Sequence, residues 1–173
     1  MNEAKILIAE DELIARENLA HVLTQQGAAV TAVVNGAQAQ AAVDKDQYDV
    51  VLTDMRMPDI SGMELLQFIK AKAPDTEVIV LTGYATVDNA VKAMGKGAFQ
   101  YLAKPVRLDE VMLLTQKALE KKRLKEEVAM LRQQLETSGS ERIIGHSKPV
   151  NVLKRQIDQV AAVGCTVLIQ GET

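Results

Sequence analysis

Aromatic side chains are scarce in this 173-residue chain: tryptophan is absent, and phenylalanine and tyrosine together make up 3% of the residues. The core must therefore be built from aliphatic side chains. Proteins that stack the bases of single-stranded nucleic acids need exposed aromatics, so this function class is not expected. The net charge of −3 offers no general attraction to nucleic acid or to an anionic membrane surface. Any DNA contact would need a separate module.

Cysteine and long apolar runs are also lacking. The single Cys165 excludes an intrachain disulfide and a cysteine-based zinc site, which fits a reducing compartment. His21 and His146 are far apart and have no ligand-spaced partner, so they do not indicate a metal site. No apolar run approaches the ~18 residues of a spanning helix, and no signal peptide is apparent. We expect a cytoplasmic protein without membrane contact.

Five short apolar runs rich in β-branched residues alternate with amphipathic stretches. This alternation predicts βα units around a parallel sheet, here a three-layer, doubly wound α/β fold. The strand order 2-1-3-4-5 would bring the polar residues that follow these strands to one edge of the sheet. Gly27 and Gly97 are expected to end helices, and Thr86 or Asp88 to cap the fourth helix. The expected strands are residues 5–9, 30–34, 50–53, 78–81 and 100–103.

A long helix is predicted after the fifth strand, because no glycine or proline interrupts residues 108–136. Its distal part carries apolar residues at heptad spacing, which favours a dimerising helix, with a solvated connector helix as the alternative. The seam consists of Leu124, Val128, Leu131 and Leu135.

Acidic, hydroxyl and basic side chains follow the predicted strands at their carboxyl ends, where open parallel sheets place their sites. Glu10, Asp11 and Glu12 follow the first strand, Asp54 the third, Thr82 the fourth and Lys104 the fifth. Carboxylates brought together in this way repel one another unless a cation compensates.

Mg²⁺ is the natural compensating cation, because it prefers carboxylate, carbonyl and water oxygens. We expect Asp11, Asp54 and the backbone carbonyl of Arg56 as its ligands. Asp54 would then stay ionised and attack phosphorus as a nucleophile. Thr82 and Lys104 would neutralise charge on the transferred phosphoryl group.

Residues 4 to about 120 resemble a response-regulator receiver domain of bacterial two-component signalling. The resemblance rests on residues 6–12 (ILIAEDE), 52–62 (LTDMRMPDISG), 81–85 (LTGYA) and 101–105 (YLAKP). It implies a flavodoxin-like (CheY-like) fold in which Asp54 is the phosphoacceptor. It also implies an acidic Mg²⁺ pocket of Glu10 and Asp11, phosphoryl contacts from Thr82 and Lys104, and a cis peptide before Pro105. Tyr101 would swing inward with Thr82, and Arg56 and Tyr84 would tune phosphate lifetime. Many receivers carry Asp where this chain has Glu10, which is expected to reach the metal through water.

Residues 143–173 are similar to the opening of the sigma-54-dependent ATPase domain of NtrC-type regulators. The similarity includes a helix to about residue 161, a strand over 166–170, and Gly171 as the first glycine of a truncated phosphate-binding loop. We therefore expect a receiver domain (1–120), a long helix and dimerising linker (108–137), and a piece of the ATPase domain (138–173). ATP would bind only the full-length protein.

The favoured interpretation is a phosphorylation-controlled switch that is not itself an enzyme. A sensor histidine kinase would phosphorylate it and a second copy would pair with it. Sigma-54 RNA polymerase and DNA would be reached only through further domains. One alternative is a phosphatase with an aspartyl nucleophile, although Arg56 stands where such enzymes carry a second acid. The other is a pseudo-receiver that docks partners without phosphorylation.

Overall fold

The computed structural model describes residues 4–138, 147–161 and 168, and side chains within α5 as far as residue 133. The chain divides into two compact units, Met1–Glu127 and Val128–Thr173. The predicted strand over 166–170 and the predicted loop glycine Gly171 lie outside the described residues.

The first unit is built on a five-stranded parallel sheet with the order β2-β1-β3-β4-β5, which confirms the predicted topology. The three central strands are almost entirely buried, as expected for strands covered by helices on both faces. The strands are β1 (Lys5–Ala9), β2 (Ala29–Val33), β3 (Val50–Asp54), β4 (Glu77–Thr82) and β5 (Gln100–Ala103).

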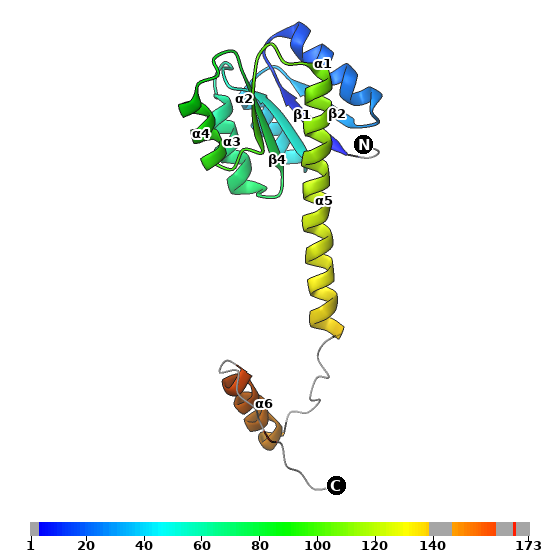
Figure 1. The fold of residues 1–173 in the computed structure, drawn as a ribbon, viewed down its shortest axis with the longest axis vertical. Coiled ribbons are helices and arrows are strands. Elements are labelled where there is room, and N and C mark those ends of the chain that lie inside the picture. The colour runs from blue at the N-terminus through cyan, green and yellow to red at the C-terminus, as the bar shows by residue number, and fades with distance from the viewer. Residues whose placement is uncertain (1–3, 139–146, 162–167, 169–173) are drawn as a thin grey trace. The chain divides into compact units, whose positions relative to one another are not determined.

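Helices cover both faces of this sheet, as Figure 1 shows. Strand residues that alternate along β1, β3 and β4 face two separate apolar clusters. One cluster lies against α2, α3 and α4, and the other against α1 and α5. The helices are α1 (Leu13–Gln25), α2 (Gly36–Lys45), α3 (Gly62–Lys72), α4 (Val87–Gly95) and α5 (Leu108–Ser138).

The helix ends follow the local signals in the sequence. Gly27 and Gly97 have φ angles of 83° and 90°, a conformation that glycine adopts without steric cost, and they follow α1 and α4. Of the two expected caps of α4, Thr86 is the one used, since its side chain accepts a hydrogen bond from the backbone N–H of Asn89.

Helix α5 runs without interruption from Leu108 to Ser138. Its first part packs on the sheet through Val111, Thr115 and Ala118, which are almost completely buried. The seam residues Leu124, Val128 and Leu131 are each about half exposed within the described part of the chain, and the side chain of Leu135 lies outside it.

The first unit extends to Glu127, beyond the expected receiver boundary at residue 120. Beyond residue 120, Lys121, Lys122 and Lys125 of α5 form ion pairs with acids at the sheet's amino-terminal edge. In the second unit, the predicted helix is present as α6 (Lys148–Ala161). A search of the described residues finds no helix with the length and apolar character needed to cross a bilayer.

Candidate functional site

Three charged side chains from different strand ends meet at the carboxyl edge of the sheet. The Nζ atom of Lys104 lies 2.7 Å from Glu10 Oε1 and 2.5 Å from Asp54 Oδ2. Glu10 is fully buried, Asp54 is 8% exposed, and one fifth of the Lys104 side chain is accessible. The structure therefore brings together residues separated by 50 and 94 positions in the chain.

The backbone holds Asp54 closely in place. Asp54 ends β3 and pairs in register with Leu81, and the N–H of Met55 donates to the carbonyl of Leu81 at 2.7 Å. Behind it, a Cβ atom on Gly62 would lie only 2.2 Å from the Asp54 carbonyl oxygen. Glycine at position 62 is thus required for α3 to begin against the acidic strand end. This role of Gly62 was not predicted, although the residue stood in the quoted motif.

Burial and pairing set the charge states of the site. Burial raises the pKa of the Glu10 carboxyl, and the ion pair with Lys104 opposes this rise. For Lys104, burial works against the charged form, but the bonds to Asp54 and Glu10 outweigh it and raise its pKa above the ordinary 10.5. Lys104 is therefore a fixed positive charge between two carboxylates throughout the physiological pH range.

Carboxylate oxygens of Glu10, Asp11 and Asp54 lie within 4.8 Å of one another, close enough to share one metal ion. Glu10 Oε2 is buried and has no hydrogen-bond partner, so one lone-pair-rich oxygen lacks compensation. An all-oxygen, anionic donor set of this kind suits a hard divalent cation. The residues present fit Mg²⁺.

The turn after β1 is braced by Arg16, a residue that the sequence analysis missed. Its Nη1 atom donates to the carbonyl of Glu10 at 2.8 Å and to that of Asp11 at 3.2 Å. These bonds fix the backbone from which both acids project. The sequence signal for this contact was weak, because it consists only of an arginine that follows Glu10, Asp11 and Glu12 by about one helical turn.

The predicted switch residues lie beside one another on β4, β5 and the loop between β4 and α4. Thr82 Oγ1 is buried and accepts a hydrogen bond from the N–H of Tyr84 at 3.2 Å. The hydroxyl of Tyr101, which is half-buried, donates to the carbonyl of Tyr84 at 3.5 Å. Tyr84 thus connects the two positions.

Arg56 and Tyr84, the two predicted lifetime residues, are in direct contact. The Arg56 guanidinium carbon lies 4.3 Å from the centre of the Tyr84 ring, a cation–π arrangement. The N–H of Arg56 also donates to Asp54 Oδ1 at 3.2 Å, while the metal-binding role of its carbonyl stays a prediction. The peptide bond between Lys104 and Pro105 is cis.

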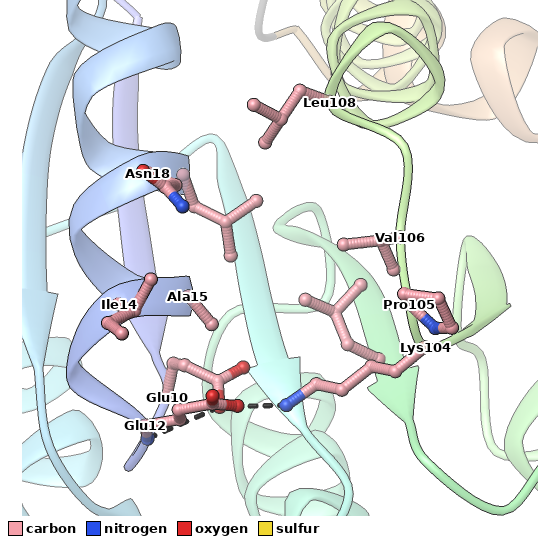
Figure 2. A pocket seen from close by; sticks show the side chains of 11 residues that line it. Glu10, Glu12, Ile14, Ala15, Asn18, Lys104, Pro105, Val106 and Leu108 are labelled. Atoms are coloured by element: carbon pink, nitrogen blue, oxygen red, sulfur yellow. Dashed lines mark hydrogen bonds and ion pairs between the residues drawn. The ribbon is translucent and has the colours of Figure 1, made fainter.

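A groove of about 530 Å³ opens beside the site (Figure 2). Side chains of α1 form one wall, and the segment from Lys104 to Leu108 forms the other. Glu10, Glu12 and Lys104 lie at one end of the groove. Apart from Asn18, the rest of the lining is apolar and includes Ile14, Val106 and Leu108. The charged site is thus bordered by an apolar surface.

The chain is similar to known transcriptional regulators. It is 34% identical to the response regulator protein PilR of Pseudomonas aeruginosa over all of its length, 36% to the C4-dicarboxylate transport regulator DctD of the same organism over 99%, and 30% to NtrC of Proteus hauseri over 100%. It spans only 37%, 37% and 36% of those relatives.

Solved structures of response regulators are also similar to this chain. A receiver domain from Clostridium thermocellum is 37% identical with a TM-score of 0.66, covering 70% of this chain and 98% of that one. NtrX from Brucella abortus is 29% identical with a TM-score of 0.72, covering 92% of this chain and 35% of that one. The profile of the response regulator receiver domain matches residues 6–116. The chain belongs to the response regulator receiver domain family, and its relatives include regulators of the NtrC type.

Proposed function

We propose that Asp54 accepts a phosphoryl group from the phosphohistidine of a sensor kinase and that its phosphorylation switches the contacts of the protein. The observation that supports this most strongly is the placement of Lys104 within 2.7 Å of Glu10 and 2.5 Å of Asp54. Lys104 contacts both acids at once, and all three residues lie at strand ends on the carboxyl edge of the sheet. Two nearly buried acids that share one lysine are typical of a functional site, here one that could bind a divalent cation and a phosphoryl group.

In the proposed transfer, a carboxylate oxygen of Asp54 forms a bond to phosphorus. The bond between phosphorus and the donor's imidazole nitrogen breaks, and the imidazole keeps its electron pair and takes up a proton. Lys104 Nζ and the Thr82 hydroxyl are the side chains of this chain suited to hold the phosphoryl oxygens. Lys104 is charged at neutral pH, as an ordinary lysine is, and although burial opposes the charged form, the bonds to Asp54 and Glu10 outweigh burial and raise its pKa further.

Glu10, Asp11 and Asp54 would hold Mg²⁺, with the Arg56 carbonyl as a further ligand. The ion would supply charge neutralisation at the phosphoryl oxygens. Glu10, with one buried oxygen unpaired, accounts for part of the negative charge that the ion would offset.

We infer that the switch runs through Thr82, Tyr84 and Tyr101. Movement of the Thr82 hydroxyl toward a phosphoryl group would remove the acceptor of the Tyr84 N–H. Tyr101 bonds to the same residue and would respond. The stacked Arg56 and Tyr84 would set how readily water reaches the phosphorylated Asp54.

Because the chain spans only 37% of the length of PilR, the activity of the intact protein is inferred from such relatives. We propose a cytoplasmic, NtrC-type regulator with a receiver over 1–120, a linker over 108–137 and the start of an ATPase domain over 138–173. The linker helix, a face of the receiver, or both would mediate homodimer formation. A solved relative is described as the beryllofluoride-activated NtrC4 receiver domain dimer, 32% identical with a TM-score of 0.65 over 68% of this chain and 98% of that one. Contacts with sigma-54 RNA polymerase and DNA, and ATP binding, would belong to the longer protein.

The test is incubation of the purified chain with a small phosphodonor, such as acetyl phosphate, and Mg²⁺. Intact mass should increase by one phosphoryl group, and chelation of Mg²⁺ should abolish the increase. An unchanged mass would favour the docking module, whereas steady turnover of an aryl phosphate would favour the phosphatase.

A further inference from the structure

A second cluster of charged residues lies at the opposite, amino-terminal edge of the sheet. Glu77, the first residue of β4, is only 1% exposed. Position 77 starts a central strand whose next four residues, 78–81, are apolar, so an apolar side chain of similar volume would avoid the cost of burying a charge there. A buried acid in this place requires an explanation.

Glu77 is contacted by cations from two different helices. Lys121 of α5 places its Nζ 2.8 Å from Glu77 Oε1, an ion pair without hydrogen-bond geometry. Lys70 of α3 places its Nζ 3.7 Å from Glu77 Oε2 and donates to the carbonyl of Thr76 at 2.6 Å. The Lys121 ammonium also lies 5.2 Å from the centre of the Phe99 ring.

Neighbouring pairs extend the contact along α5. Lys122 forms an ion pair with Asp49, the residue before β3, and both side chains are largely buried. Asp49 also accepts from the N–H of Lys5 at 2.7 Å. Lys125 lies 3.8 Å from Asp75 in a more exposed pair. We call Lys121, Lys122 and Lys125 with Asp49, Asp75 and Glu77 the α5 clasp.

We propose that Glu77 is a positioning residue for α5, which holds the linker-side part of this helix on the receiver through Lys121 and ties it to α3 through Lys70. Exposed ion pairs contribute little, so the effect rests on the buried members of the clasp. The α5 residues of the apolar cluster extend to Leu119, and the ion pairs of the clasp continue along the helix to Lys125, about two turns further. The clasp thus determines where the helix leaves the receiver.

Hydrogen exchange of the full chain tests this proposal. Glu77→Gln keeps the shape of the side chain and removes its charge, and Lys121→Gln removes the partner charge from a half-exposed position. Each variant should exchange the amides of residues 119–127 about tenfold faster than the wild type, because each loses the contact between Lys121 and the buried Glu77 that holds this part of α5. Amides of α1 should keep their wild-type rates.

The double variant Glu77→Gln/Lys121→Gln should be no faster than the faster single variant, since both changes break the same contact. Lys117→Gln is the matched control. Lys117 is exposed on the same helix and forms no ion pair within the described residues, so residues 119–127 of this variant should exchange at the wild-type rate. Unchanged exchange of 119–127 in Lys121→Gln, or an equal acceleration in α1, would overturn the proposal even if Glu77→Gln does not fold.

Discussion

At the scale of single residues, Lys104 is the cation that pairs with both acids of the site. Its charge compensates one fully buried and one nearly buried carboxylate. Without it, Glu10 and Asp54 would lose the cation that the described part of the chain places between them. The stability of the receiver should therefore depend on Lys104, and this dependence should change with divalent cations.

We expect Lys104→Met to lower the free energy of unfolding by about 3 kcal/mol in the absence of divalent cations, the scale for removing one partner of a buried pair. Mg²⁺ should raise the melting temperature of the variant more than that of the wild type, because the added cation replaces the lost charge. Melting curves with and without Mg²⁺ check this, with Lys117→Met as the control. If Mg²⁺ raised the melting temperatures of Lys104→Met and the wild type equally, the assigned role of Lys104 would be contradicted.

The pH dependence has a definite sign. The pKa of Lys104 is raised by Asp54 and Glu10 against the opposing effect of burial, so its contribution is fully present below the ordinary 10.5 and is lost only as the pH rises through the raised value. The contribution of Lys104 itself should therefore be constant between neutral pH and about pH 9. A contribution that fell within this range would show that the lysine is not held by the two acids.

Gly62 supplies a second prediction at this scale. Gly62→Ala places a methyl group 2.2 Å from the Asp54 carbonyl, so the strand end or the helix start must move. We expect a loss of about 1–3 kcal/mol in urea unfolding, together with slower labelling by acetyl phosphate. Gly95→Ala in α4 is the control, since a Cβ there meets nothing within 4 Å. Equal stability of the two variants would contradict the close packing behind Asp54.

At the scale of elements, α3 begins with a capping box that fixes the loop after Asp54. The Ser61 side chain accepts from the N–H of Glu64 at 3.3 Å, and the Ser61 N–H donates to Glu64 Oε2 at 2.9 Å. Ser61→Ala should cost about 1 kcal/mol in urea unfolding at neutral pH. No measurable loss would mean that tertiary packing alone starts the helix.

The same cap predicts an acid-sensitive contribution. Hydrogen bonds from the Ser61 side chain and backbone lower the pKa of Glu64 below its ordinary 4.5. The stabilisation is therefore present above pH 4.5 and is lost as the pH falls through the lower value in the folded protein. The stability difference between wild type and Glu64→Gln should shrink on acidification to about pH 3. A constant difference would contradict the sign.

Periodic elements could be predicted from the sequence, whereas contacts between distant side chains could not. Apolar runs such as 78–81 are bounded by polar residues and need only local information, so all five strands were predicted. The strand order, which the structure confirms, is not encoded in these runs, and was chosen because it brings the polar strand ends to one edge. The pairing of Lys121 with Glu77 depends on how far α5 continues over the sheet, which no local pattern encodes. The stacking of Arg56 on Tyr84 likewise depends on two loops of different strands.

At the scale of the whole molecule, the seam on distal α5 is an apolar surface that a second copy would cover. Leu131→Asp should convert a linker-held dimer into a monomer in light scattering after gel filtration, because a charge in a heptad seam is poorly tolerated. Met130→Asp makes the same chemical change one position away and off the seam, and should leave the dimer intact. If Leu131→Asp and Met130→Asp have the same oligomeric mass, a solvated connector helix would be favoured over a dimerising one.

Addition of beryllofluoride and Mg²⁺ to the wild type should change the dimer contacts. Separation of the dimer would indicate that phosphorylation relieves repression, whereas a larger assembly would indicate that it promotes activation. No change in mass or in hydrogen exchange at α4, β5 or α5 would contradict the switch.

The most direct measurement is the location of the phosphoryl group. After labelling with acetyl phosphate and Mg²⁺, reduction with borohydride converts an acyl phosphate into an alcohol at the modified residue, which peptide mass spectrometry identifies. The account predicts conversion of Asp54 alone, no conversion in Asp54→Asn, and strongly reduced conversion in Lys104→Met. Label on another residue, or undiminished label in Asp54→Asn, would contradict it.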